Sequence, residues 1–128
     1  MKWLLDTHIW LWSLLEPHRL ASNITEILQN PQQELYISPI SIWETLILAE
    51  RNKLKLEPTA PEWIIEALQK SPIQETPLSI EIAIKSRLIK LPHQDPADRF
   101  IAATAWEYNM TLITADEQLR KTTQIKIL

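Results

Sequence analysis

Glycine and cysteine are both absent from this sequence of 128 residues. Phosphate-binding loops of the P-loop and dinucleotide types need glycine, because the lack of a Cβ lets the backbone approach the phosphates. The sequence therefore excludes nucleotide binding by those routes. The lack of cysteine excludes disulfides and thiolate metal sites, and it favours a cytoplasmic location.

Long hydrophobic runs and a large excess of one charge are also missing. Residues 1–17 are mostly apolar, but Asp6 and His8 interrupt them and the stretch is too short for a bilayer. We therefore expect neither a signal peptide nor a membrane segment. The net charge of −3 excludes a bulk cationic nucleic-acid binder. An apolar fraction of 45% is that of an ordinary globular protein, and we expect residues 1–128 to form one domain.

Segments of strand and helix character alternate along the whole chain. We expect strands at 2–5, 34–38, 76–78, 111–114 and 125–128, and helices at 7–16, 23–30, 39–53, 61–70, 79–89, 96–109 and 116–121. This alternation predicts an α/β fold, a three-layer α/β/α sandwich with a central, mostly parallel sheet. Ligand sites in such sheets form beyond the carboxyl ends of the strands.

Four acidic residues have positions that suit such a site. Asp6 and Asp116 each follow a predicted strand, Glu44 lies inside the long helix, and Asp98 lies in the first turn of another. Two carboxylates about 4 Å apart repel by roughly 4 kcal/mol at an effective dielectric near 20, so a cluster needs protons or a cation. Mg²⁺ and Mn²⁺ prefer oxygen ligands and activate water towards phosphodiesters. Neutralising these four acids changes the net charge from −3 to +1, which permits RNA binding without requiring it.

Each acid also has a purely structural interpretation. Asp6 and Asp116 both precede predicted helices and are compatible with N-capping. Asp95, directly before Pro96, is a better helix cap than ligand, whereas Asp98 suits either a site or the helix dipole. We favour a site role for Asp6 because it ends a buried strand.

Glu44 is the most informative acid. Its helical neighbours are Ile40, Ile47 and Leu48, so we expect a buried carboxylate that needs a metal or a partner. An ion pair with Arg51 is the alternative.

The motifs that carry these acids resemble those of a known family. They are LLDTHIWLW at 4–12, SPISIWET at 38–45, HQDPADRFIAATA at 93–105 and LITAD at 112–116. In order and spacing the set is similar to PIN-domain ribonucleases of the VapC toxin type. The resemblance implies a PIN fold whose acidic pocket binds Mg²⁺ or Mn²⁺ through Asp6, Glu44, Asp98 and Asp116, the catalytic acids. It also implies RNA cleavage, a homodimer and neutralisation by a VapB-type antitoxin.

Further residues are candidates for supporting roles. By motif position Thr114 would support the site beside Asp116, with Asp95 as a second supporting residue. Arg51, Lys53 and Arg99 are candidate contacts for RNA phosphates. We expect the histidine at position 8 to be buried and hydrogen-bonded, His93 to serve the turn before Asp95, and the six tryptophans to pack in the core or at a dimer interface.

Other protein classes that gather acids at strand ends fit less well. A phospho-acceptor receiver domain needs an aspartate after its third strand, and no aspartate occurs between Asp6 and Asp95. A haloacid-dehalogenase-type phosphatase needs Asp-x-Asp, and His8 occupies the second of those positions. A catalytically inactive PIN module that only binds would have lost acids, and all four are present. A receiver-like or inactive PIN binding module is nevertheless the alternative interpretation.

Overall fold

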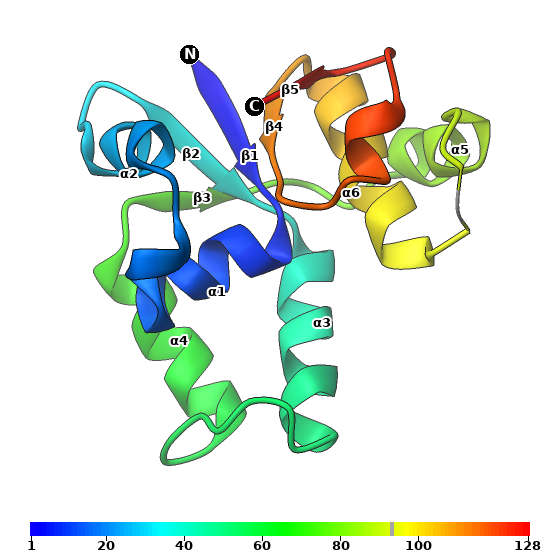
Figure 1. Cartoon of the computed structure of the whole chain (residues 1–128). Coiled ribbons are helices and arrows are strands. Elements are labelled where there is room, and N and C mark those ends of the chain that lie inside the picture. The colour runs from blue at the N-terminus through cyan, green and yellow to red at the C-terminus, as the bar shows by residue number, and fades with distance from the viewer. Residues whose placement is uncertain (93) are drawn as a thin grey trace.

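The computed structural model describes residues 1–92 and 94–128. His93, which we expected to serve the turn before Asp95, lies outside the described residues. Five strands form one sheet in the order β3-β2-β1-β4-β5, and every pair is parallel (Figure 1). Their bounds are β1 Lys2–Leu5, β2 Glu34–Ile37, β3 Ile73–Glu75, β4 Thr111–Ile113 and β5 Lys126–Ile127.

Helices cover both faces of this sheet, as the alternating pattern predicts. On one side lie α1 (Thr7–Leu15), α2 (Ser22–Gln29), α3 (Pro39–Glu50) and α4 (Ala60–Lys70), with the short 3₁₀ turn η1 (Pro17–Arg19). On the other lie α5 (Ile80–Leu88) and α6 (Pro96–Tyr108), with the 3₁₀ turn η2 (Leu119–Lys121). The α/β/α architecture with a parallel sheet is confirmed. In the described part of the chain, no helix has both the length and the hydropathy needed to cross a bilayer.

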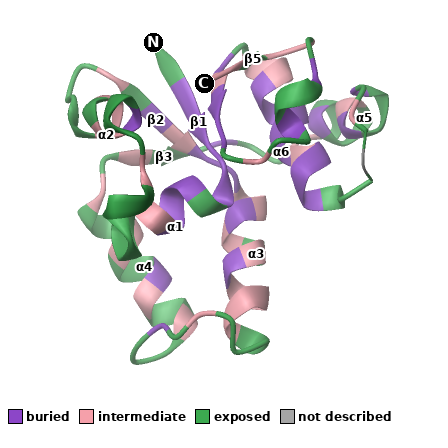
Figure 2. Ribbon diagram, viewed as in Figure 1, coloured by how far each residue is buried: buried purple, intermediate pink, exposed green. Residues whose placement is uncertain are grey.

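The central strand β1 connects the two hydrophobic clusters. Successive side chains of a strand point to opposite faces, so Trp3 and Leu5 pack with the α1–α4 cluster while Leu4 packs against α6. The same alternation holds in β4, where Leu112 and Ile113 face opposite ways. Figure 2 shows these central strands and much of α6 as buried. The sheet is thus fixed in register from both sides, which holds its carboxyl edge in place.

The third strand lies earlier in the chain than predicted. We expected it at 76–78, but β3 is Ile73–Glu75, paired with Leu35–Ile37 of β2. The Thr76 N–H still donates to the Ile37 carbonyl at 2.9 Å, and Pro77 has no N–H with which to continue the ladder. Only Ile73 of this edge strand packs against the core, so its sequence lacks the apolar alternation of a half-buried strand.

Two further predictions need correction near the helix ends. The segment predicted as a helix at 116–121 is a turn followed by η2. The helix predicted at 39–53 ends at Glu50, and Asn52 then adopts φ 57°. Asn109 after α6 has φ 52°. Helices commonly end with a glycine in the left-handed conformation, and in this glycine-free chain asparagine adopts that conformation after both helices.

Helix α3 is also less buried than its sequence predicts. Only Ser41 and Thr45 are buried in it, and Trp43 is 51% exposed. The helix extends beyond the carboxyl edge of the sheet beside α4 (Figure 1), so the sheet covers only its first turns. Those first turns bring Glu44 to the sheet edge.

Candidate active site

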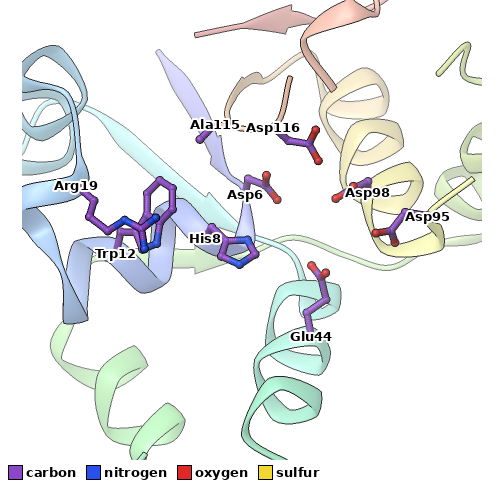
Figure 3. A pocket seen from close by; sticks show the side chains of 9 residues that line it. All are labelled: Asp6, His8, Trp12, Arg19, Glu44, Asp95, Asp98, Ala115 and Asp116. Carbon is purple, nitrogen blue, oxygen red and sulfur yellow. The ribbon is translucent and has the colours of Figure 1, made fainter. Parts of the chain in front are cut away.

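A cavity of about 470 Å³ opens at the carboxyl edge of the sheet. Parallel strands end together at this edge, and the chain leaves β1, β2 and β4 directly into the segments that surround the cavity. Figure 3 shows the acidic side chains that turn their carboxyl groups towards this space, namely Asp6, Glu44, Asp95, Asp98 and Asp116. The residues that line the cavity are Asp6, His8, Trp12, Arg19, Glu44, Asp95, Asp98, Ala115 and Asp116. The structure therefore brings together all four predicted acids, which are up to 110 positions apart in the sequence.

Asp6 is both the cap of α1 and a wall of the cavity. Its Oδ1 accepts a hydrogen bond from the Thr7 N–H at 2.8 Å, and its Oδ2 accepts one from the Thr114 hydroxyl at 2.6 Å. The two interpretations that the sequence left open are thus compatible. Thr114, which was expected to support the site, donates its hydroxyl to the Asp6 carboxylate and also accepts a bond from the Asp116 N–H at 3.0 Å.

Glu44 is held by the hydroxyl group of Thr7 and not by Arg51. The Thr7 hydroxyl donates to Glu44 Oε1 at 2.5 Å and lies 2.9 Å from the Ser41 hydroxyl. The salt bridges found among the described residues include none between Glu44 and Arg51. Thr7 and Ser41 were not singled out from the sequence, although both are one helical turn or less from a predicted acid.

Asp95 and Asp98 enter the cavity from the first turn of α6. Asp95 caps this helix, since its Oδ1 accepts a bond from the Ala97 N–H at 3.0 Å. Asp98 is only 9% exposed. Helix α6 packs tightly on the sheet through Ile101 and Ala102, both fully buried, which holds Asp98 at the cavity wall.

Asp116 completes the acidic wall from the loop after β4. Its Oδ1 accepts a bond from the Gln118 N–H at 2.7 Å, so it caps the following turn as the sequence allowed. It remains half-buried and lines the cavity.

Burial and mutual repulsion favour the neutral forms of three of these acids. Burial raises the pKa of Asp6, although the Thr114 and Thr7 hydrogen bonds oppose that rise. Burial also raises the pKa of Glu44, against the hydrogen bond from Thr7. The pKa of Asp98 rises to about 8, first through burial and then through repulsion from Asp6, Asp95, Asp116 and Glu44. The cluster therefore binds protons more readily than isolated carboxylates do.

The donor set fits a hard divalent cation. The cavity presents five carboxylates, one imidazole at His8 and no thiolate, and carboxylate oxygens are the ligands that Mg²⁺ and Mn²⁺ prefer. Among the described residues, however, no three acidic or imidazole groups are already close enough to hold one ion together. A cation that keeps several waters bridges such gaps.

One predicted RNA contact, Arg99, lies in the interior of the protein. Arg99 is 5% exposed and points away from solvent, with Nε donating to the Ser86 carbonyl and Nη2 to the Ile89 carbonyl, both at 2.7 Å. It joins the end of α5 to α6. Its position next to Asp98 in the sequence suggested a shared surface, but neighbouring positions of a helix point in different directions.

The other basic candidates lie on the surface around the site. Arg51 and Lys53 are exposed and line two smaller cavities that adjoin the acidic one. The histidine at position 8 is exposed at the meeting point of all three cavities, so the expectation that it is buried is wrong. Sequence reasoning also missed Trp12 and Arg19 as lining residues. Trp12 lies four positions after His8 on α1, but no pattern marks Arg19, which follows the end of that helix.

Comparisons with known proteins match nearly the whole chain. A family model described as the PIN domain matches residues 3–124. The chain is 32% identical to ribonuclease VapC22 of Mycobacterium tuberculosis over 120 residues, which cover 91% of this chain and 88% of that protein.

Solved structures show the same fold. One is VapBC2 from Rickettsia felis bound to a DNA fragment from its promoter, with a TM-score of 0.72, 18% identity and coverage of 100% of this chain and 98% of the other. Another is DNA-bound VapBC from Salmonella typhimurium, with a TM-score of 0.71, 21% identity and coverage of 100% and 97%.

Proposed function

This chain belongs to the PIN-domain family, and on that premise we propose that it is a metal-dependent endoribonuclease, the toxin of a VapBC-type toxin–antitoxin pair. Ribonuclease VapC22, at 32% identity, supports RNA as the substrate. The observation that carries the chemistry is the convergence of Asp6, Glu44, Asp98 and Asp116 on one cavity.

We assign the primary binding of Mg²⁺ or Mn²⁺ to Asp6 and Asp98. They are the most buried acids of the cavity, at 6% and 9% exposure. Burial and repulsion from neighbouring acids raise the pKa of both, and a divalent cation would offset that repulsion. Glu44 and Asp116 complete the set from the opposite walls (Figure 3). When bound, such a cation lowers the pKa of water and neutralises charge on a phosphodiester.

The protein's own groups orient this set before any cation arrives. The hydroxyl of Thr114 fixes one oxygen of Asp6, and the hydroxyl of Thr7 fixes Glu44. Hydrogen bonds of this kind hold ligands in a productive direction and reduce the cost of reorganisation. A bound divalent cation would offset part of the acidic charge and so weaken the repulsion between the cavity and the phosphates of RNA.

Cleavage of RNA by purified protein tests this proposal. A mixed single-stranded RNA pool is incubated with wild type, Asp6→Asn, Asp98→Asn and a matched control, Glu26→Gln, which removes an exposed acid of α2. We expect cleavage by wild type and Glu26→Gln with Mg²⁺ or Mn²⁺, none with chelator, and a loss of at least about a hundredfold in both aspartate variants. Equal cleavage by Asp6→Asn and wild type would contradict the assignment. Failure of every variant to cleave or bind metal would favour an inactive PIN binding module.

We also infer a VapB-type antitoxin and a homodimer as partners. The structural neighbours include VapBC complexes. Exposed apolar side chains provide surface for such partners. Ile80, Ile84 and Leu88 are exposed along α5, and Trp43 is exposed on α3. We take residues 1–128 as one domain, because β5 near the end of the chain pairs into the same sheet as β1. A cytoplasmic location follows from its proposed RNA substrate.

A further inference from the structure

Arg19 lies on the rim of the acidic cavity, across from the carboxyl groups (Figure 3). Among the described residues that line this cavity, five are acids and Arg19 alone carries a permanent positive charge. A phosphodiester that approaches five carboxylates is repelled, and a divalent cation offsets only part of that charge. A fixed cation on the rim would supply attraction where an RNA chain enters.

Two neighbours fix the guanidinium of Arg19. Its Cζ lies 4.2 Å from the centroid of the Trp12 ring, and its Nη1 lies 3.4 Å from Glu16 Oε2. Trp12 is half-buried and packs against the hydrophobic cluster of the α1–α4 face, so it is a firm platform. The Arg19 N–H also donates to the Glu16 carbonyl at 2.9 Å, which closes the turn before α2. A guanidinium stacked by one face keeps its N–H edges available.

A structural role alone does not account for this arrangement. The Arg19 and Glu16 side chains are each 48% exposed, and exposed ion pairs contribute little to stability. Their separation is also long for a charge-assisted hydrogen bond. When an anion arrives, Arg19 can therefore release Glu16, or contact both groups at once, with little loss of folding stability.

The cavity continues past Arg19 towards further basic residues. A second hollow of about 270 Å³ shares His8, Trp12 and Arg19 with the acidic cavity and reaches Lys53. Another, of about 390 Å³, also shares His8 and reaches Arg51. An RNA chain that leaves the acids on the Trp12 side would therefore meet both Arg19 and Lys53 in the same hollow.

We propose that Arg19 binds a backbone phosphate of the RNA next to the one that is cleaved, and that Trp12 holds its guanidinium in position. This inference rests on the proposed ribonuclease function. Two parallel N–H groups along one edge of a guanidinium match two oxygens of a phosphate. The single ammonium group of lysine does not reproduce this geometry. Arg19 thus takes the role that the sequence had suggested for Arg99.

The test measures RNA binding without cleavage. Fluorescence anisotropy follows a labelled single-stranded RNA of twelve or so nucleotides bound to Asp98→Asn protein in Mg²⁺, at several salt concentrations. Adding Arg19→Ala should weaken binding by roughly tenfold and lower the slope of log K against log salt by about 0.7, as for one phosphate of a single strand. Arg19→Lys should keep most of the slope and lose part of the affinity. The control is Arg87→Ala, which removes an exposed arginine of α5 that hydrogen-bonds Gln94 and lines none of the three cavities.

The outcomes separate this inference from the proposed function. If wild type cleaves RNA but Arg19→Ala binds with unchanged affinity and slope, or loses no more than Arg87→Ala, Arg19 does not bind the phosphate and the nuclease proposal stands. If wild type neither binds nor cleaves RNA, both fail together. Circular dichroism and thermal melts check folding, and Arg19→Gln, which keeps more of the side chain but not its charge, replaces Arg19→Ala if the latter unfolds.

Discussion

Replacing Asp98 with asparagine should stabilise the metal-free protein while abolishing its activity. Asp98 is 9% exposed and its pKa is raised from 3.8 to about 8 by burial and by four neighbouring acids. The unfolded chain ionises Asp98 near pH 4, whereas the folded protein resists ionisation until about pH 8. The resulting cost to folding is absent below the unfolded pKa, grows between these two values and is complete above about pH 8.

The size of this effect follows from the shift. A difference of about four pKa units corresponds to a ceiling of roughly 6 kcal/mol at about 1.4 kcal/mol per unit. Water in the open cavity, counterions and repulsion that persists among the other acids reduce it, so we expect Asp98→Asn to gain about 1–3 kcal/mol at pH 8. At pH 4 the two proteins should have nearly equal free energies of unfolding.

Urea unfolding of chelator-treated protein at pH 4, 6 and 8 measures this difference. Wild type should lose stability as the pH rises over that range, and Asp98→Asn should lose less. Mg²⁺ should stabilise wild type at pH 8 but not the variant. The control Glu26→Gln, which replaces an exposed acid of α2, should have a free energy of unfolding within about 0.5 kcal/mol of wild type. A variant that is less stable than wild type at pH 8 without metal would refute the repulsion argument.

Two other substitutions distinguish a residue that orients the acids of the site from a residue that stabilises the fold. Thr114→Val removes the hydroxyl that donates to Asp6 and should lower metal-dependent cleavage by about 10- to 100-fold with little change in melting temperature; activity equal to wild type would show that this hydrogen bond is dispensable. Arg99→Met leaves the Ser86 and Ile89 carbonyls without their guanidinium donors and should cost about 2–4 kcal/mol in urea unfolding, with RNA affinity retained. Lost affinity with unchanged stability would restore Arg99 as an RNA contact.

Much of the fold was predictable because the strands are short, apolar and evenly separated by helices. Residues 2–5 were placed correctly, since β1 is buried on both faces and bounded by Asp6. The edge strand β3 was misplaced because only one of its residues packs against the core. Burial of α3 was overestimated. Its sequence is apolar, but most of the helix extends past the sheet, so no strand covers those residues.

The acids of the site were predictable for a topological reason, and their neighbours were not. Parallel strands end at one edge, so Asp6 and Asp116 had to lie close together once β1 and β4 paired. The direction of Arg99, by contrast, depends on which carbonyls the end of α5 presents, and the stacking of Arg19 on Trp12 depends on the turn η1. Side-chain contacts between separate elements depend on how the connecting turns place those elements, and such contacts leave no periodic signal in a sequence.

Anomalous diffraction from crystals soaked in Mn²⁺ would test the central claim most directly, because it locates the metal without depending on any RNA target. The account predicts an anomalous peak in the acidic cavity, in contact with Asp6 and Asp98 of wild type and missing in Asp98→Asn. A peak elsewhere, with the cavity empty and RNA cleavage still dependent on Mn²⁺, would contradict the assignment of these carboxylates to the metal.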